Sequence, residues 1–251
     1  MNRRFENHVA VISGGAKGIG KAIAYRLAYE GAKIACFDLD HKALEKTVQE
    51  LRNSSTEVIG IPVDVSDEPS VIKGYEKVIE QFGGIHIVIN AAGIVGPTHT
   101  SILQYETSAF DNLYKVNLKG SFLMAKYGLS HMVHQKYGRV LLLASMAGKD
   151  GNPFMVGYTA SKAGVIGMVK GLGKEFATHG ITVNGLAPAV IKTEMNLNTA
   201  PEQLEYMKSL IPMGRLGTVE EVASVACFIV SPENSFSTGF VYDISGGRAT
   251  Y

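Results

Sequence analysis

Seven short apolar runs recur along the chain, and each is followed by an amphipathic stretch long enough to form a helix or by a turn. The runs are rich in Val and Ile and are continuously apolar rather than alternating, which is typical of strands covered on both faces. They span residues 8–13, 33–38, 57–64, 85–92, 139–145, 181–188 and 240–245. This rhythm predicts an α/β chain with a doubly wound, seven-stranded parallel sheet.

The helices between the runs show ordinary start and stop signals. Ile19, Ile23 and Leu27 share one face of the first helix, which Gly31 ends. The second helix is expected after Asp40 and the third after Asp67, since an aspartate is a good N-cap.

One domain over residues 1–251 is the simplest organisation, because no Pro/Gly/Ser-rich or charged linker divides the chain. The rhythm breaks only near 189–218, where prolines and glycines interrupt a helical piece at 201–210. A long insertion beyond the carboxyl end of a strand is a common place for a lid, so this segment is predicted to cover the substrate.

Several classes of protein are disfavoured by the composition. Lys and Arg number 24 against 23 Asp and Glu, which offers no electrostatic footprint for nucleic acid or an anionic membrane. The N-terminal apolar run is too short for a signal sequence or a membrane span, so we expect a cytoplasmic protein. Cys36 and Cys227 are expected to be buried and reduced, and the scattered histidines suggest no metal site.

A glycine-rich loop follows the first apolar run and precedes the first helix. Gly14, Gly18 and Gly20 have the spacing Gly-x-x-x-Gly-x-Gly, with Lys17 and Ile19 between them. Such a loop lets the backbone approach a pyrophosphate closely at a helix N-terminus, as in the Rossmann fold. The alternative is a plain tight turn between strand and helix.

Two aspartates, Asp38 and Asp64, are expected to end the second and third strands and are candidate partners of the adenosine half of a dinucleotide. Asp38 ends the second strand about 20 residues beyond the loop, where a carboxylate accepts bonds from ribose hydroxyls and repels a 2′-phosphate. This favours NAD over NADP, with Lys17 as a nearby cation that argues otherwise. Asp64 could bond the adenine amino group or be a turn carboxylate before Ser66. Asp38 could instead be a cap, although Asp40 suits that role better.

Polar residues that could carry out the reaction lie near the same predicted edge of the sheet. Tyr158 and Lys162 are four residues apart on one helix face. A tyrosine pKa of about 10 is too high for easy proton exchange, and a neighbouring ammonium favours the phenolate. Ser145 ends the fifth strand, where it could hold a substrate oxygen. A packed ring beside a solvated lysine is the alternative for the Tyr/Lys pair.

Taken together, these motifs resemble the short-chain dehydrogenase/reductase family over residues 5–247. The resemblance is carried by the glycine loop, Asn90-Ala91-Ala92-Gly93, Asn117 within Lys-Val-Asn, Ser145, and Tyr158 with Lys162. It implies that Tyr158 transfers a proton, Ser145 orients the substrate oxygen, Lys162 bonds the nicotinamide ribose and lowers the tyrosine pKa, and Asn117 holds a relay water. The implied cofactor residues are Gly14, Lys17, Gly18, Ile19, Gly20, Asp38, Asp64, Val65, Asn90, Ala91, Gly93, Tyr158, Lys162, Pro188, Val190, Ile191 and Thr193. Ala189 stands where the family usually has Gly, which questions the turn geometry there.

The implied activity is NAD-dependent interconversion of a secondary alcohol and a ketone. The chain is similar both to NAD-linked dehydrogenases of 2-keto-3-deoxy sugar acids and to 3-oxoacyl-(acyl carrier protein) reductases. For a substrate carboxylate, Lys149, Lys192 or Arg248 could supply a cation. A non-catalytic NAD sensor is the rival class, although it would have no use for the Tyr/Lys/Ser/Asn set.

Four glycines between 164 and 173 lie in a predicted helix, where they destabilise unless another backbone packs closely. The family builds dimers and tetramers with this helix and the one near 107–134, so a homotetramer is expected.

Overall fold

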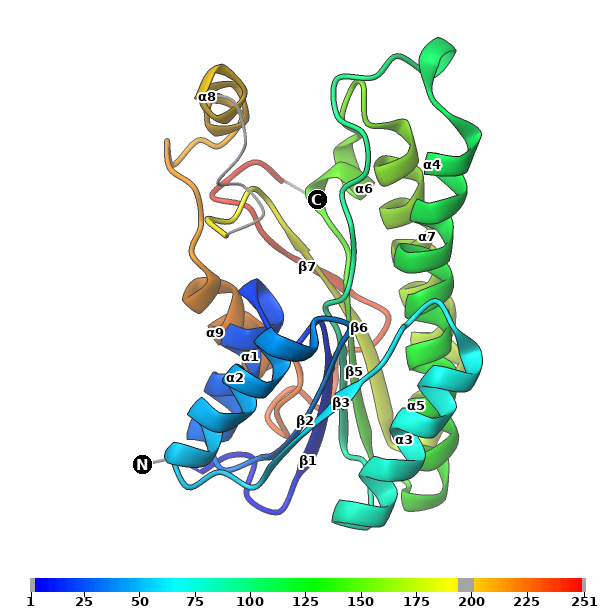
Figure 1. Cartoon of the computed structure of the whole chain (residues 1–251), viewed down its shortest axis with the longest axis vertical. Coiled ribbons are helices and arrows are strands. Elements are labelled where there is room, and N and C mark those ends of the chain that lie inside the picture. The colour runs from blue at the N-terminus through cyan, green and yellow to red at the C-terminus, as the bar shows by residue number, and fades with distance from the viewer. Residues whose placement is uncertain (1–2, 194–200, 250–251) are drawn as a thin grey trace.

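The computed structural model describes residues 3–193 and 201–249, with no account of the side chains of 201–204. Seven strands form one parallel sheet in the order β3-β2-β1-β4-β5-β6-β7 (Figure 1). Their bounds are β1 Val9–Ser13, β2 Lys33–Asp38, β3 Val58–Pro62, β4 Ile87–Asn90, β5 Gly138–Leu143, β6 Ile181–Pro188 and β7 Val241–Ile244. The predicted doubly wound, seven-stranded α/β fold is confirmed.

Two layers of helices cover the two faces of the sheet. α1, α2 and α9 lie on one face, and α3, α5 and α7 lie on the other (Figure 1). The α-helices are α1 Gly18–Tyr29, α2 His41–Asn53, α3 Glu68–Phe82, α4 Thr107–Leu113, α5 Gly120–Gln135, α6 Met146–Asp150, α7 Val156–Glu175, α8 Pro201–Ser209 and α9 Val219–Ile229. Short 3-10 turns are η1 Ile102–Gln104 and η3 Ala177–His179, and η2 Tyr114–Lys119 is a π-helix. Each layer buries its own apolar cluster against the sheet.

The helix signals in the sequence act as expected. The Asp40 side chain caps α2 by accepting from the Ala43 backbone N–H, and Asp67 caps α3 by accepting from Ser70. Gly31, just beyond α1, adopts a φ of +100°, which favours glycine. Cys36 and Cys227 are buried free thiols, as predicted, and burial raises the pKa of each to about 12.

Three strands end two residues before their apolar runs end. β3 ends at Pro62, β4 at Asn90 and β5 at Leu143. The prediction that Ser145 and Asp64 end strands is therefore wrong. The two residues after each strand turn away from the ladder where the next helix or loop begins, and apolarity alone does not mark that point.

All strands run parallel, so their carboxyl ends meet at one edge, which is uppermost in Figure 1. The chain winds outward from β1 in one direction and from β4 in the other, and Ser13 of β1 pairs with Asn90 of β4. Ligands of open α/β sheets bind at such a reversal of strand order. The fold therefore places the candidate site above β1 and β4.

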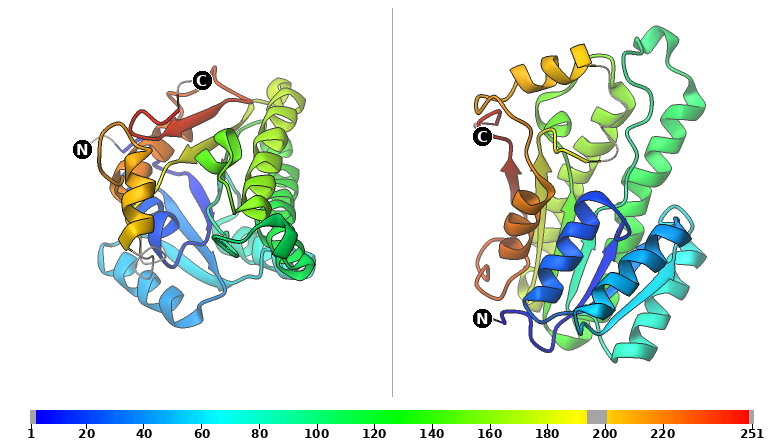
Figure 2. Two further views of the ribbon diagram at one scale, coloured as in Figure 1. Left: turned by 90° about the horizontal axis from the view of Figure 1, so that it is seen from above. Right: turned by 60° about the vertical axis from the view of Figure 1, so that its left-hand side comes forward.

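The described residues of the segment 189–218, namely 189–193 and 201–218, lie beyond this edge. A single bridge joins Ile191 to Gly217, and α8 stands apart from the sheet (Figure 2). Residues 194–200 of the predicted lid lie outside the described residues. No helix in the described part of the chain is long and apolar enough to span a membrane.

Candidate active site

The loop between β1 and α1 folds tightly under the carboxyl edge. Gly14 has a φ of +65°, and a Cβ there would lie 2.9 Å from the Ala92 backbone nitrogen. A Cβ on Gly20 would lie 2.1 Å from the Gly14 carbonyl oxygen. Gly18 has a φ of +52°, and among the residues that the structure describes only Thr193 would lie near an added Cβ, at 3.8 Å. The loop therefore requires glycine for backbone contact at Gly14 and Gly20 and leaves space at Gly18.

The start of α1 is suited to an anion. Lys17 occupies the N-cap position and makes no side-chain capping bond. The first N–H groups of a helix have no partner within the helix, and the helix dipole makes this end positive. The close fit at Gly14 and Gly20 together with this uncapped end fits the pyrophosphate of a dinucleotide.

Asp38 is held at the end of β2 by two backbone N–H groups. Its Oδ2 accepts from Ala16 at 3.1 Å, and its Oδ1 accepts from Asp40 at 3.0 Å. Asp40 caps α2, so the cap alternative for Asp38 is wrong. Lys17 Nζ binds Asp40 Oδ2 at 2.6 Å, and this bond lowers the pKa of Asp40. The cation that argued for NADP therefore has a carboxylate partner.

Asp64 and Val65 lie beyond the end of β3. Asp64 Oδ1 accepts from both the backbone N–H and the hydroxyl of Ser66 at 2.8 Å. This is the turn that the sequence offered as an alternative to adenine binding. Val65 is buried, and its side chain would contact a Cβ on Gly120 at 2.9 Å. Val65 can therefore reach a cofactor through its backbone, with its side chain in the core.

The turn after β4 has one buried and several cavity-lining residues. Asn90 is 1% exposed. Its Oδ1 accepts from the Ser13 hydroxyl, and its Nδ2 donates to Ser121 Oγ at 2.8 Å. The Asn90 side chain thus links β1, β4 and α5 through hydrogen bonds. Ala91 and Gly93, by contrast, line a cavity at the carboxyl edge of the sheet.

Asn117 lies in the π-helical turn between α4 and α5, which the sequence did not reveal. Its Oδ1 accepts from the Ile94 N–H at 2.9 Å, and its Nδ2 donates to the Ile94 carbonyl at 2.9 Å and to Ser161 Oγ at 3.0 Å. The Asn117 carbonyl accepts from the Ser121 hydroxyl at 2.6 Å. π turns are frequent at functional sites, and here the turn joins the loop after β4 to α7.

Ser145, Tyr158 and Lys162 come together above β5. Ser145 is the N-cap of α6, and its hydroxyl also hydrogen-bonds the Tyr158 hydroxyl. Lys162 is 6% exposed, and its Nζ donates to the Leu143 carbonyl at 2.7 Å and lies 5.9 Å from the centroid of the Tyr158 ring. The alternative of a solvated lysine is therefore wrong.

Burial dominates the ionisation of this pair. It raises the pKa of Tyr158, while the bond from Ser145 lowers it in part. It also lowers the pKa of Lys162 to about 8. The described side chains alone therefore keep Tyr158 protonated at neutral pH. The Lys162 ammonium does not bind the phenol directly, in contrast to the simplest expectation from the Tyr/Lys spacing.

A cavity of about 200 Å³ joins these groups. Its lining combines the nucleotide loop, the Tyr/Ser/Lys group and the segment after β6. Predicted site residues in this lining are Ile19, Ala91, Gly93, Ser145, Tyr158, Lys162, Pro188, Val190, Ile191 and Thr193. Residues that the motifs did not mark are Ile94, Val95, Met146, Ala147, Asn152, Met155 and Met207, most of them in loops that carry no motif.

The segment after β6 keeps its turn despite Ala189. Ala189 donates its N–H to the Ile244 carbonyl at 3.0 Å, and it is absent from the described residues that have a positive φ. An alanine therefore fits without strain. Of the three cations proposed for a substrate carboxylate, Arg248 lines the cavity, whereas Lys149 and Lys192 are not among its described lining residues.

A glycine loop at the reversal of strand order, with a Tyr/Ser/Lys group across the cavity from it, defines a class of oxidoreductases that use a nicotinamide dinucleotide. The family model described as enoyl-(acyl carrier protein) reductase matches residues 14–249. The chain belongs to the short-chain dehydrogenase/reductase family, and it is an oxidoreductase that acts on CH–OH groups.

Individual relatives cover nearly the whole chain. The NAD(+)-dependent 2-dehydro-3-deoxy-L-rhamnonate dehydrogenase of Sphingomonas sp. (strain SKA58) is 40% identical and aligns over 99% of this chain and 98% of its own. The 3-oxoacyl-[acyl-carrier-protein] reductase of Thermotoga maritima is 37% identical and aligns over 97% of this chain and 98% of its own. The crystal structure of an NAD+-bound xylitol dehydrogenase matches with a TM-score of 0.92 at 30% identity. The match covers 97% of this chain and 99% of that structure.

Proposed function

We propose that this protein is an NAD-dependent dehydrogenase of a hydroxy acid of the 2-keto-3-deoxy sugar acid type. The observation that carries the proposal is the convergence of Ser145, Tyr158 and Lys162 on one cavity that Ile19 of the glycine loop also lines. The similarity to a dehydrogenase of a 2-keto-3-deoxy sugar acid supports the substrate class.

The cofactor site is assigned to the residues at the carboxyl edge. The loop around Gly14, Lys17, Gly18, Ile19 and Gly20 would hold the pyrophosphate at the start of α1. The rest of the site would consist of Asp38, Asp64, Val65, Asn90, Ala91, Gly93, Lys162, Pro188, Val190, Ile191 and Thr193, with Asn90 and Val65 acting through their backbones. A bound nicotinamide dinucleotide supplies the acceptor or donor of the hydride.

The proton is assigned to Tyr158. Its hydroxyl bonds Ser145, so the two hydroxyls can hold one substrate oxygen between them. Lys162 is buried and close enough to the ring to favour the phenolate when the site is filled. Asn117 fixes the loop after β4 and would position a relay water through its backbone.

The preference for NAD rests on Asp38 and Lys17. The Asp38 carboxylate lies at the end of β2, where a ribose hydroxyl can donate to it and a 2′-phosphate is repelled. The Lys17 ammonium is paired with Asp40, which weakens any attraction for that phosphate.

A 3-oxoacyl-(acyl carrier protein) reductase is the second candidate, favoured by the relative from Thermotoga maritima and by the apolar residues of the cavity. A non-catalytic NAD sensor is disfavoured, because it would need the glycine loop without the Tyr/Ser/Lys group.

Assembly, lid and location complete the proposal. We assign a cytoplasmic location and a homotetrameric assembly. The assembly is supported by the outward side of α7, where a Cβ on Gly167 or Gly171 would meet nothing within 4 Å among the described residues and another subunit could pack closely. Within the same helix, a Cβ on Gly173 would lie 2.3 Å from Gly239, which explains that glycine inside the chain. The segment 189–218 is assigned as the substrate lid of this single domain.

The proposal is tested by following nicotinamide absorbance, with NAD and NADP for the hydroxyl substrates and with NADH and NADPH for the thioester, which is a ketone. The substrates are 2-dehydro-3-deoxy-L-rhamnonate, an acetoacetyl thioester and small diols. We expect the sugar acid with NAD to give the highest kcat/KM. A higher value for the thioester with NADPH would establish the second candidate, and no turnover with any substrate would favour the sensor.

A further inference from the structure

Arg248 reaches the candidate active site from the C-terminal end of the chain. It lies four residues beyond β7 and lines the same cavity as Ser145 and Tyr158. Its side chain is only 9% exposed. An arginine is rarely buried to this extent unless its guanidinium has partners, so its surroundings in the cavity need an explanation.

Two side chains from one short segment orient the guanidinium. Arg248 Nε donates to Asp150 Oδ2 at 3.0 Å, and Arg248 Nη2 donates to Asn152 Oδ1 at 2.8 Å. Asp150 is the last residue of α6, whose N-cap is Ser145. The segment from Ser145 to Asn152 therefore carries both the Ser145 hydroxyl and the two side chains that orient Arg248.

The guanidinium has donors left over after these two bonds. It carries five N–H groups, and two of them have partners among the described residues. The bonded pair, Nε and Nη2, occupies one edge of the planar group. The remaining donors, on Nη1 and Nη2, match the two oxygens of a carboxylate in a bidentate arrangement.

The charge of the cavity favours an anion. Among the described residues that line it, Lys162 and Arg248 are the charged ones, and none is acidic. Asp150, which balances Arg248 from one side, is not part of this lining. The walls include Met146, Met155 and Met207, so water around the spare donors is limited and an anion would gain from a weakly screened attraction.

We propose that Arg248 binds the carboxylate of the substrate, and that this protein therefore selects hydroxy acids over neutral alcohols of the same shape. The inference rests on the proposed function and adds the residue that recognises the acid group. Asp150 and Asn152 are positioning residues, because they orient the guanidinium and act on the substrate through it.

The test compares 2-dehydro-3-deoxy-L-rhamnonate with its methyl ester, which differs in charge at one end. For wild type, kcat/KM should favour the acid. In Arg248→Gln the ratio of kcat/KM for acid to ester should fall about 10- to 100-fold, the range for losing hydrogen bonds between charged groups. Arg248→Lys should lie between the two. Arg3→Gln is the matched control, since Arg3 is an exposed arginine paired with Glu6 ahead of β1, and it should keep the wild-type ratio.

The variant Asp150→Asn distinguishes two roles of Arg248: binding of the substrate carboxylate, or only anchoring of the C-terminal segment to Asp150. If Arg248 recognises the carboxylate, this variant keeps or raises the preference for the acid, because the cation loses a competing anion. If the pair is only a tether, Asp150→Asn and Arg248→Gln weaken acid and ester equally, and the proposal is overturned.

Binding gives a second readout that does not depend on turnover. The acid is titrated calorimetrically into the complex with NADH, in which its hydroxyl cannot be oxidised because NADH does not accept a hydride. Arg248→Gln should weaken this binding about 10-fold or more. Unchanged binding would overturn the role of Arg248 alone, whereas a wild type that binds the acid but oxidises neither compound would overturn the proposed function.

Discussion

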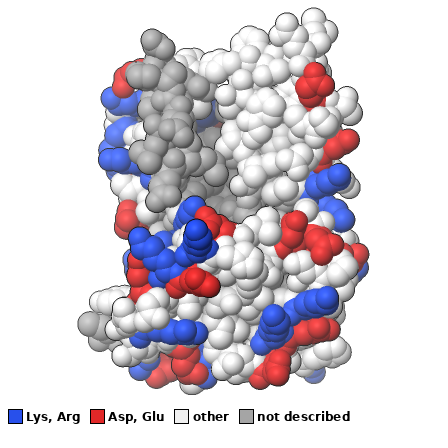
Figure 3. All heavy atoms as spheres, viewed as in Figure 1, with Lys and Arg blue, Asp and Glu red and all other residues white. Residues whose placement is uncertain are grey.

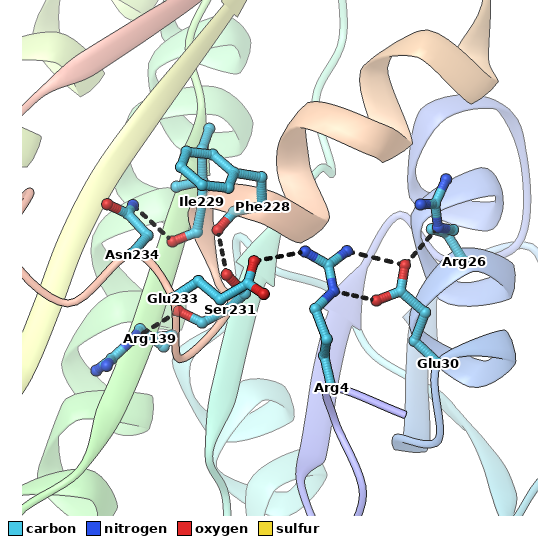
Figure 4. Close-up of polar contacts among 9 residues, drawn as sticks. All are labelled: Arg4, Arg26, Glu30, Arg139, Phe228, Ile229, Ser231, Glu233 and Asn234. Atoms are coloured by element: carbon cyan, nitrogen blue, oxygen red, sulfur yellow. Dashed lines mark hydrogen bonds and ion pairs between the residues drawn. The ribbon is translucent and has the colours of Figure 1, made fainter. Parts of the chain in front are cut away.

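At the amino ends of the strands, polar side chains bind one another, whereas at the carboxyl ends they line a cavity. Figure 4 shows Arg4 from the N-terminal segment holding both oxygens of Glu30, at 2.6 and 2.9 Å, while Arg26 binds the same carboxylate at 2.5 Å. Glu30 has a side chain that is 6% exposed. Burial opposes its ionisation, yet the bonds from the two arginines lower the pKa of Glu30.

The carboxyl edge shows the opposite balance. Lys162 is buried as deeply as Glu30 but has a backbone carbonyl rather than a carboxylate as its partner, and burial lowers its pKa to about 8. At the amino edge the buried charge of Glu30 is paired and stabilises the fold. At the carboxyl edge the buried charge of Lys162 has no carboxylate partner among the described residues, which lowers stability but provides a cation for the reaction.

The surface repeats this contrast on the side seen in Figure 3. Lys, Arg, Asp and Glu gather over the lower half, and the upper right lobe is largely uncharged. Ile102, Leu103, Phe110 and Phe154 are exposed apolar side chains of the chain between β4 and α7, on the carboxyl side of the sheet. Substrate loops of this composition suit partly apolar ligands or neighbouring subunits better than ionic partners.

Replacing Lys162 should have the largest effect on the contrast between the two edges of the sheet, because it should abolish most turnover without lowering stability. In Lys162→Met, turnover should fall roughly 10³-fold, because the phenolate of Tyr158 loses its nearby cation. The free energy of unfolding should stay level or rise by about 1 kcal/mol, since a desolvated charge is removed along with one hydrogen bond.

Steady-state kinetics and urea unfolding check both parts of this prediction. The lowered pKa of Lys162 means that the folded state disfavours the ammonium, so the stability difference between variant and wild type should shrink as pH rises from about 8. A variant with wild-type turnover, or one that is clearly less stable, would contradict the contrast between the two edges.

Replacing Glu30 should have the reverse outcome. Glu30→Gln should lower the free energy of unfolding by about 2 kcal/mol, because Arg4 and Arg26 lose their shared carboxylate. Turnover at 25 °C should not change, because Arg4 precedes β1 and Glu30 precedes β2, at the amino ends of the strands and away from the site. The matched control is Glu68→Gln, at an exposed carboxylate bonded to Lys126 and Tyr127, where a much smaller loss is expected.

The smallest effect concerns His86, at the amino edge. Its Nδ1 accepts from the Val9 N–H at 3.1 Å, and burial followed by the neighbouring His8 lowers its pKa. A lowered pKa favours the neutral ring in the folded state, so this stabilisation is present above pH 6.5 and is lost as pH falls through the folded pKa. The loss between pH 7 and 5 should be below about 1 kcal/mol.

Unfolding of His86→Asn, which keeps an acceptor for Val9, should vary less with pH over this range than unfolding of wild type. His41→Asn, at an exposed histidine, serves as the control and should follow wild type. Parallel pH profiles for all three proteins would mean that His86 makes no such contribution.

The sequence predicted the sheet well because the five inner strands β1, β2, β4, β5 and β6 are buried almost throughout, whereas the outer strands β3 and β7 are partly exposed. The glycine spacing also marked close backbone contact at Gly14 and Gly20. The π turn at Asn117, the inward-facing side chain of Asn90 and the approach of Arg248 depend on contacts between segments far apart in the chain. Periodicity and motif spacing report local structure, so these features needed the folded chain.

The ionisation of the Tyr/Lys pair is a similar case. Four-residue spacing on α7 correctly indicated that Tyr158 and Lys162 share a face, but it overestimated the direct effect of the ammonium on the phenol. Burial has the larger effect on both groups, and burial depends on α6 and β5 packing over α7.

The most direct measurement for the account as a whole is the turnover of Tyr158→Phe, with circular dichroism and NAD binding measured on the same sample. Removing one oxygen should leave folding and cofactor affinity intact while kcat falls at least about 10²-fold, the lower range for loss of a general acid/base group. A variant that binds NAD and turns over at the wild-type rate would show that the proton of the reaction does not pass through this phenol.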